Sequence, residues 1–409
     1  MICPFVVLSL LVFGVAAAPL APSQSSCLSI PIQKHVNVTG GHNLVNAGHS
    51  RARSFRDRTV SKHNSSTKRQ EVPVVNEAIT YIAEIAVGAD NQTFHLLVDT
   101  GSSNTWVGAN ASYTYVPSSS SVWTDDIVIV DYGSGYFFGA SFLTLSNDLV
   151  ITNQSIGVAD FQQGFTSMDG VLGIGPVDLT DGTILGSLAP VTTVPTVSDN
   201  LFNQGVISTE VIGVSFVPTT GAANEPDGEL IFGDVGGSSR YTGQITYTCV
   251  TPSSPRETDY WGITQSISYG DTEIMASAIG VVDTGTTLNY MPTDTFNAYI
   301  NTTGGIYDEV TGLYEITEEQ YNALDDLIFI IGGTDFPLTP NAQIWPRDLN
   351  ENIGGEAGKI YLAAVATEPV ENLNFINGYV FLERYFSIFD NSNSRVGFAV
   401  TPYTNATTN

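Results

Sequence analysis

Two short segments of this 409-residue chain repeat one pattern, and they constrain its fold more than any other feature. The first, at positions 96–107, reads LLVDTGSSNTWV, and the second, at positions 280–290, reads GVVDTGTTLNY. In each segment an apolar run typical of a buried strand leads into Asp-Thr-Gly and then into further hydroxyl residues. Glycine lets two backbones approach closely, and hydroxyl groups can donate to a carboxylate. The repeat predicts two similar halves, each presenting one carboxylate, Asp99 or Asp283, at a shared interface.

This duplicated signature resembles that of the pepsin-like aspartic peptidases. The resemblance covers residues from about 70 to about 402, and in character the chain is similar to secreted fungal enzymes of the polyporopepsin type. One Asp-Thr-Gly alone is usually an ordinary turn, whereas two with the same flanks are specific. The resemblance implies an all-β, bilobal acid protease fold, with two β-barrel-like lobes, a central cleft and a flap hairpin. We expect the amino-terminal lobe at 70–242 and the carboxy-terminal lobe at 243–409.

The resemblance also implies roles for the residues of the two loops. Asp99 and Asp283 are the expected catalytic pair: they share one proton, so one carboxyl can act as a base on a water while the other acts as an acid on the scissile carbonyl. Which of the two is the base in which step stays open. Their neighbours are expected to lock the loops together, to bond the carboxylates and to permit close approach; these residues are Thr100, Gly101, Ser102, Thr284, Gly285 and Thr286.

A third motif, Tyr132-Gly133-Ser134-Gly135, is typical of a mobile hairpin tip, because glycine allows positive φ. A lone Tyr-Gly pair is usually only a turn, but its place after the first Asp-Thr-Gly resembles the family's flap, which closes over bound peptide. We therefore expect Tyr132, Gly133 and Ser134 to contact substrate, with Trp106 as the indole partner of Tyr132. Relatives with an acid at the position of Ser134 tolerate lysine, so the serine predicts a weak preference for lysine there.

Residue patterns also predict local structure along the rest of the chain. Strands are expected at 79–87, 126–130 and 229–232, and short helices at 293–301 and 317–323. Segments 169–175 and 375–381 resemble the strands that thread the family's two catalytic loops. Asn377 stands where the family normally has an apolar residue; this departure touches no catalytic atom, and whether it loosens the packing of the second lobe stays open.

The first 69 residues differ from the rest in composition. Residues 1–18 hold a short apolar run followed by three alanines, as in a cleaved secretory signal, so the protein is expected to be secreted and extracellular, with an acidic vacuolar compartment less favoured. Residues 19–69, the basic segment, hold eight of the 14 Lys and Arg and one of the 41 acids, which leaves six basic residues against 40 acids beyond it. The two parts should attract one another.

This charge split predicts a propeptide that covers an acidic cleft as an intramolecular inhibitor; a solvated basic tail is the alternative. Residues 28–32 resemble the first strand of such a segment, and Lys34 or Lys62 could neutralise the aspartate pair. Lys68-Arg69 is typical of a processing site.

Several classes of site are not expected. Cys249 is the one cysteine after the basic segment, so it cannot form an intramolecular disulfide there, and we expect a buried structural thiol. All five histidines precede Leu96, and we expect no metal and no cofactor. The scattered basic residues predict no nucleic-acid binding, and we expect a monomer without a membrane segment. Candidate glycosylation sites are Asn91, Asn110, Asn153, Asn301 and Asn405.

The resemblance and the composition together predict an aspartic endopeptidase that cleaves polypeptides between apolar or aromatic residues. A cleft between β lobes suits an extended chain. The excess of acids predicts an acidic working range, because protonation relieves charge repulsion in the folded state. One rival is an inactive binding protein on the same fold, but such proteins commonly lose one Asp-Thr-Gly. A two-carboxylate glycosidase is the other, and its acids would not be expected in duplicated loops.

Overall fold

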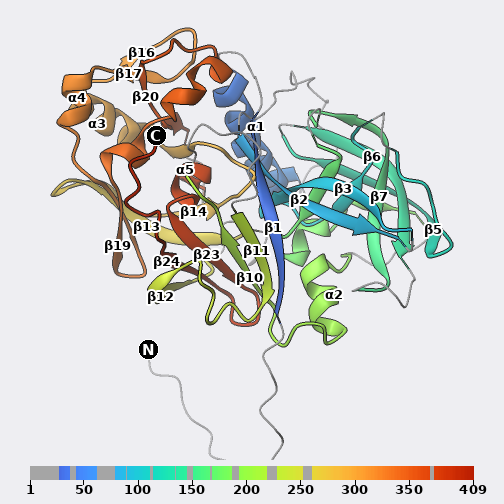
Figure 1. Ribbon diagram of the computed structural model, residues 1–409. Coiled ribbons are helices and arrows are strands. Elements are labelled where there is room, and N and C mark those ends of the chain that lie inside the picture. Colours follow the sequence, from blue (N-terminus) through green and yellow to red (C-terminus); the bar gives the residue numbers. More distant parts are fainter. Residues whose placement is uncertain are drawn as a thin grey trace, which may run out of the picture.

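The computed structural model describes residues 27–36, 43–61, 79–88, 90–110, 114–133, 135–144, 151–165, 168–186, 193–218, 228–251, 260–368 and 373–409. Within these residues the protein is predominantly β, and its strands form two halves joined by a central sheet (Figure 1). The prediction of an all-β, bilobal fold is confirmed.

The largest sheet of the described chain has fourteen strands and crosses from one half to the other. Its order is β12 (Thr242–Cys249), β24 (Arg395–Val400), β23 (Tyr385–Asp390), β10 (Val211–Ser215), β11 (Gly228–Gly233), β1 (Cys27–Val36), β2 (Ile79–Val87), β3 (Gln92–Asp99), β8 (Gly170–Gly173), β4 (Thr105–Val107), β7 (Gln154–Gln163), β6 (Tyr136–Thr144), β5 (Ser121–Asp131) and β9 (Ile184–Leu185). Strand β1, from the basic segment, is central and pairs antiparallel with both β11 and β2.

The carboxy-terminal half contains two smaller sheets. The first runs β19 (Thr334–Leu338), β18 (Leu327–Ile331), β13 (Gly262–Tyr269), β14 (Thr272–Val282), β22 (Ile376–Asn377), β15 (Asn289–Pro292) and β21 (Ala364–Thr367). The second runs β16 (Ile306–Tyr307), β17 (Tyr314–Ile316) and β20 (Ile360–Leu362). The 3₁₀ turns are η1 (Val177–Thr180), η2 (Pro340–Gln343) and η3 (Arg347–Ile353).

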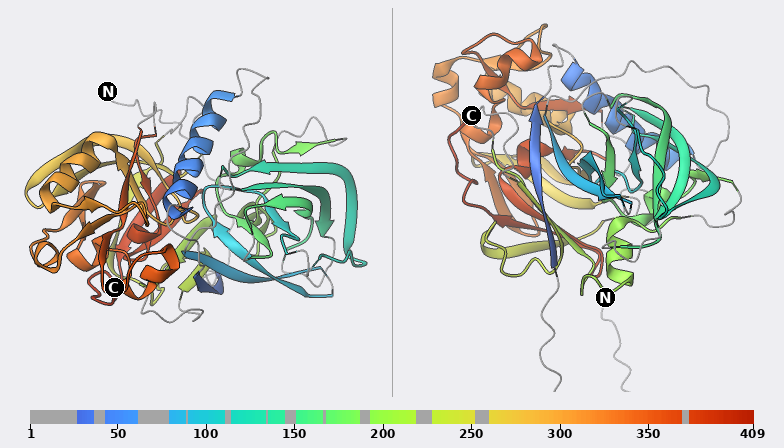
Figure 2. Two further views of the ribbon diagram at one scale, coloured as in Figure 1. Left: turned by 90° about the horizontal axis from the view of Figure 1, so that it is seen from above. Right: turned by 45° about the vertical axis from the view of Figure 1, so that its right-hand side comes forward.

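Four of the described α-helices are short: α2 (Val197–Asn203), α3 (Thr293–Thr303), α4 (Glu318–Asn322) and α5 (Tyr379–Leu382). The long one, α1 (Asn43–Ser61), belongs to the basic segment and lies between the two halves (Figure 2). Both predicted helices are confirmed, and Thr317 and Gln320 form the capping box expected for α4. Helix α1 was not predicted.

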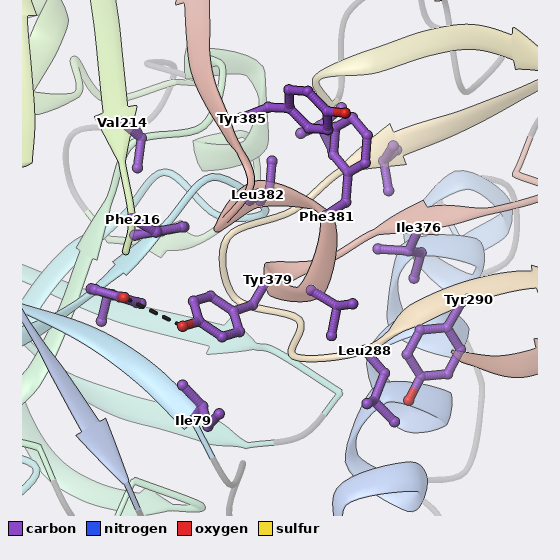
Figure 3. Close-up of a cluster of buried hydrophobic side chains, with 14 of the residues drawn as sticks. Ile79, Val214, Phe216, Leu288, Tyr290, Ile376, Tyr379, Phe381, Leu382 and Tyr385 are labelled. Atoms are coloured by element: carbon purple, nitrogen blue, oxygen red, sulfur yellow. Dashed lines mark hydrogen bonds between the residues drawn. The ribbon is translucent and has the colours of Figure 1, made fainter. Parts of the chain in front are cut away.

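The two halves share buried aromatic contacts at the central sheet. Tyr81 of β2 stacks on Phe216 with ring centroids 4.0 Å apart, and Tyr379 of α5 lies 5.3 Å from Tyr81. The hydroxyl groups of Tyr81 and Tyr379 both donate to the Val217 carbonyl, at 3.0 and 3.4 Å. Figure 3 shows Tyr379 and Phe216 facing one another across this junction. The junction therefore combines apolar burial with satisfied hydroxyls, which fixes how the halves meet.

One expectation about the carboxy-terminal half is wrong, and the open question about Asn377 is answered. Cys249 is exposed and not buried; it ends β12, which is the last strand in the order of its sheet. Asn377 does not loosen the packing, since it is buried and exchanges two hydrogen bonds with Gln265, at 2.7 and 3.1 Å. A polar residue in the core is tolerated here because its amide is matched by another amide.

Candidate active site

Each aspartate of the repeated motif is delivered by a strand and held by a second strand that runs beside it. Asp99 ends β3, which pairs in parallel with β8, and the Asp99 carbonyl accepts a hydrogen bond from Ile174 N at 2.8 Å. Asp283 follows β14, which pairs in parallel with β22, and its N–H donates to the Asn377 carbonyl at 3.1 Å. The two halves therefore present their aspartates in matching ways.

Hydroxyl groups cross between the loops and tie them together. Thr100 Oγ1 accepts from Thr284 N at 2.9 Å and donates to the Val282 carbonyl at 3.2 Å. In return, Thr284 Oγ1 accepts from Thr100 N at 3.0 Å and donates to the Val98 carbonyl at 2.9 Å. Each hydroxyl thus satisfies one donor and one acceptor of the opposite loop. This reciprocal exchange fixes the spacing of the two carboxylates.

Each carboxylate also receives two hydrogen bonds from its own loop. Ser102 Oγ donates to Asp99 Oδ2 at 2.5 Å, and Gly101 N donates to Asp99 Oδ1 at 3.0 Å. The equivalent bonds to Asp283 come from Thr286 Oγ1 at 2.5 Å and Gly285 N at 3.1 Å. Both aspartate side chains are almost completely buried. The fixed donors hold the inner edges of the carboxylates toward one another.

The glycines of the two loops leave room for this approach. A Cβ built on Gly101 would lie 2.6 Å from Asp283 Oδ1, and one built on Gly285 would lie 2.6 Å from Asp99 Oδ1. Neither distance is compatible with a side chain, so both positions require glycine.

Arg51, from the middle of α1, occupies the space between the two carboxylates. Its Nε donates to Asp283 Oδ2 at 2.6 Å and its Nη2 to Asp283 Oδ1 at 2.9 Å, which is a two-pronged contact with one carboxylate. Nη2 also contacts Asp99 Oδ1. Arg51 is 2% exposed and packs over the Phe55 ring, 5.2 Å from its centroid. A buried guanidinium with three charge-assisted hydrogen bonds neutralises the pair.

The asymmetry of this contact separates the two aspartates. Burial raises the pKa of Asp99, since it outweighs the charge of Arg51 and acts together with the repulsion from Asp283. Burial also acts to raise the pKa of Asp283, but the charge and hydrogen bonds of Arg51, with those of Thr286 and Gly285, leave it lowered. With Arg51 in place, the proton that the two carboxyl groups share is therefore favoured on Asp99, and Asp283 stays ionised in contact with Arg51.

The residue between the aspartates is not one of the two lysines named from the sequence. Lys34 is buried in β1, where its charge acts on Glu383 in the carboxy-terminal half, and Lys62 lies outside the described residues. Arg51 was missed because no helix was predicted in the basic segment. Residues 43–61 contain no proline, and reading them as a helix would have placed Arg51 near its centre.

The hairpin β5–β6 carries the Tyr132 motif, and its tip meets α1. Trp106 Nε1 donates to Tyr132 Oη at 2.7 Å, so the expected indole partner is in contact. Gly133 has a φ of 75°, and a Cβ on it would lie 2.4 Å from the Ser50 carbonyl oxygen of α1. The Trp106 ring stacks on Phe137 at 4.4 Å and meets Phe165 at 5.0 Å. Ser134 lies outside the described residues.

Comparison with known proteins decides the family. The model of the family described as eukaryotic aspartyl protease matches residues 80–401. This chain belongs to that family. The aspartyl protease chain is 50% identical to polyporopepsin of Irpex lacteus over 344 residues, which is 83% of this chain and 99% of that protein. It is 30% identical to human gastricsin over 348 residues, covering 80% of this chain and 83% of the other.

A solved structure supports the same relationship for the aspartyl protease. The crystal structure of an aspartic proteinase from Irpex lacteus superposes with a TM-score of 0.76 at 43% sequence identity, covering 94% of this chain and 100% of the other. The predicted family and its polyporopepsin-like character are confirmed, and the chain is an aspartic-type endopeptidase.

Other predicted features can be located on the aspartyl protease. The five candidate glycosylation asparagines are all exposed: Asn91, Asn110, Asn153, Asn301 and Asn405. The described residues contain no group of three or more His, Cys, Asp or Glu side chains that could hold a metal ion. The same residues contain no helix long and apolar enough to cross a membrane. The expected processing pair at positions 68–69 lies outside the described residues.

Proposed function

We propose that this chain is the precursor of a secreted endopeptidase in which Asp99 and Asp283 activate water at acidic pH. The reciprocal threonine bonds and the two loop donors on each carboxylate support this assignment most strongly, because they hold two carboxyl groups beside one another. The apolar run and alanines of residues 1–18 support secretion.

The chemistry follows from the shared proton. The ionised carboxylate of the pair removes a proton from a bound water, whose oxygen attacks the scissile carbonyl carbon. The protonated carboxyl gives its proton to the carbonyl oxygen, which forms a gem-diol. Collapse of the gem-diol then breaks the C–N bond as a proton passes to the leaving nitrogen. No covalent bond between enzyme and substrate is needed.

The substrate is proposed to be an extended polypeptide with apolar or aromatic residues beside the scissile bond. The buried aromatic cluster of Trp106, Phe137 and Phe165 supports this, because it packs with Tyr132 and gives the flap hairpin an apolar, aromatic base. Peptide main-chain groups would bond to the flap hairpin and the opposite loops.

We also propose that the basic segment is a propeptide and an intramolecular inhibitor. Arg51 bonds both carboxylates, so no water can be activated while α1 is in place. Strand β1 anchors the segment in the central sheet between β11 and β2. Removal of the segment would clear the cleft.

The test is to express residues 19–409, incubate the protein at pH 3.5 and pH 7, and measure cleavage of a denatured protein with and without a statine-type inhibitor. Inhibitor-sensitive cleavage at pH 3.5 should fall by roughly a thousand-fold in Asp99→Asn and in Asp283→Asn. The exposed Asp335→Asn variant carries the same chemical change away from the cleft and should retain activity. Absence of cleavage by a folded, processed wild-type sample would instead favour a peptide-binding protein.

A further inference from the structure

Between α1 and the carboxy-terminal half lies a partly open cavity of about 680 Å³. One face of α1 lines it through Asn46, His49 and Arg53. Tyr290 joins the two sides: its hydroxyl donates to the Val45 carbonyl at 3.2 Å, and Figure 3 shows it beside the helix. The opposite wall is largely apolar and aromatic; it includes Phe296, Tyr314, Val365, Leu373, Phe375 and Ile376.

Among the described residues that line the cavity, one acid and one permanent cation are present, and they come from opposite sides. Glu368, just after β21, is exposed and accepts a hydrogen bond from the Thr293 hydroxyl at 3.3 Å. Arg53 enters from α1, where its Nε donates to the His49 carbonyl at 3.2 Å. The wall that belongs to the enzyme body thus offers apolar area and one carboxylate, and the basic segment places an arginine there.

The cavity wall adjoins the strand that leads to Asp283. Ile376 of β22 pairs with Val281 of β14, two residues before Asp283, and Val281 N donates to the Phe375 carbonyl at 3.1 Å. Arg53 is two residues along α1 from Arg51, so the two side chains leave the helix on nearly opposite faces, one toward the cavity and one toward the aspartates. One residue of an extended peptide spans about 3.3 Å, so the cavity would be reached by a substrate residue within about three positions of the scissile bond.

We propose that, after the basic segment has left, this wall is a subsite for an arginine or lysine side chain of the substrate. The inference rests on the proposed endopeptidase function. The long aliphatic stem of such a side chain can pack on Phe296, Leu373 and Ile376, while its charged end reaches the carboxylate of Glu368 at the exposed rim. The 40 acids beyond the basic segment add a general attraction for basic peptides.

This subsite is distinct from the position under the flap tip. Ser134 predicts a weak preference for lysine in the residue held by the flap, whereas Glu368 lies in the other half of the molecule, after β21. The two expectations therefore concern different residues of one substrate. A basic residue of the substrate is expected at the wall that carries Glu368, and an apolar or aromatic residue is expected under the flap tip.

The experiment uses the processed enzyme from the full chain and a set of fluorogenic peptides of one parent sequence. Each of the three residues on either side of the cleaved bond is varied in turn among Lys, Arg, Gln and Met, and kcat/KM is measured at pH 5.5, where carboxylates in water are ionised. At one position Lys and Arg should exceed Gln by about three- to ten-fold. In Glu368→Gln that preference should disappear, and in Glu368→Lys it should invert in favour of Gln.

The matched control is Glu273→Gln, which makes the same change at an exposed glutamate of β14 outside the cavity and should leave the preference intact. Cleavage by the wild type without a basic preference at any position, or with a preference that persists in Glu368→Gln, would overturn this inference alone. If kcat/KM of the wild type does not exceed that of Asp99→Asn for any peptide, the proposed function fails and this inference fails with it.

Discussion

At the scale of single residues, the decisive contact is made by a guanidinium. Arg51 donates twice to Asp283 and once to Asp99, and a planar fork can do this where the single ammonium of a lysine cannot match the geometry. The same contact explains why the pKa values of the two aspartates shift in opposite directions. Asp283 accepts two hydrogen bonds from Arg51, and these favour its ionised form. Inhibition by the basic segment would thus depend on the protonation of the pair it covers.

Arg51→Ala is expected to release the basic segment at higher pH. The pKa of Asp283 is lowered by Arg51, so the stabilising contact is present above the ordinary aspartate pKa and is lost as pH falls through the lowered value. Without the guanidinium, the state in which α1 covers the aspartates loses that stabilisation. The pH at the midpoint of activation should therefore rise by about 1–2 units. Activity after fixed incubation times, measured from pH 3 to pH 7, gives the midpoint.

Two matched variants sharpen this measurement. Arg51→Lys keeps the charge but loses the fork, so its midpoint should fall between those of wild type and Arg51→Ala. Arg53→Ala removes a neighbouring arginine of α1 that does not bond the aspartates and should activate like wild type. An unchanged midpoint in Arg51→Ala would contradict the inhibitory role of this contact.

At the scale of elements, the second catalytic loop depends on a polar pair set into a sheet. Gln265 of β13 and Asn377 of β22 lie on either side of β14, the strand that leads to Asp283. Their side-chain amides exchange hydrogen bonds and both are buried. The polar side chain at position 377 is therefore matched by a second polar side chain in the same core.

Asn377→Leu alone should destabilise the protein by about 1–3 kcal/mol, because it leaves the buried Gln265 amide without its partner. The double variant Gln265→Leu with Asn377→Leu should recover most of that loss, since both polar groups are then removed. Urea unfolding followed by tryptophan fluorescence measures the apparent difference. If the loss in free energy of unfolding in the double variant equals the sum of the losses in the two single variants, the amide pair is not the cause.

At the scale of the whole molecule, acidic pH is expected to favour the contact between the halves. Glu210 precedes β10, its N–H donates to Ser392 Oγ at 3.0 Å, and its carbonyl accepts from Asn391 N at 3.0 Å in the turn between β23 and β24. Its carboxyl meets Asp199 of α2, together with Ser198 and Asn391. Burial, followed by the hydrogen bond and charge of Asp199, raises the pKa of Glu210 to about 7.

Glu210 should therefore make the protein less stable as pH rises. The folded state holds a proton on Glu210 that the unfolded chain releases near pH 4.5, so the free energy of unfolding falls between about pH 4.5 and 7. Allowing for water around this half-exposed group, the loss is about 1–2 kcal/mol. In Glu210→Gln this part of the pH dependence should vanish, as measured by thermal unfolding across that range. A pH profile identical to wild type would exclude this carboxyl as a cause.

Much of the fold and of the candidate site could be predicted because the signals are local. Alternation predicted β2 with both its ends, and the residues Thr317 and Gln320 predicted the cap of α4. The repeated Asp-Thr-Gly segments predicted which side chains would meet, since strand, turn and hydroxyl neighbours are all contiguous in sequence. The structure then brings Asp99 and Asp283 together with Thr100 and Thr284 crossing between them.

What the sequence by itself determined was therefore the set of strands, the duplicated loops and the chemistry that two carboxyl groups can share. Only the tertiary structure decided which basic residue enters the cleft, because helix α1 turns its side chains in different directions and only its docking between the halves selects Arg51. The exposure of Cys249 and the pairing of Asn377 with Gln265 were decided in the same way. Each depends on whether a segment distant in sequence lies beside the residue, and no local pattern of residues specifies that.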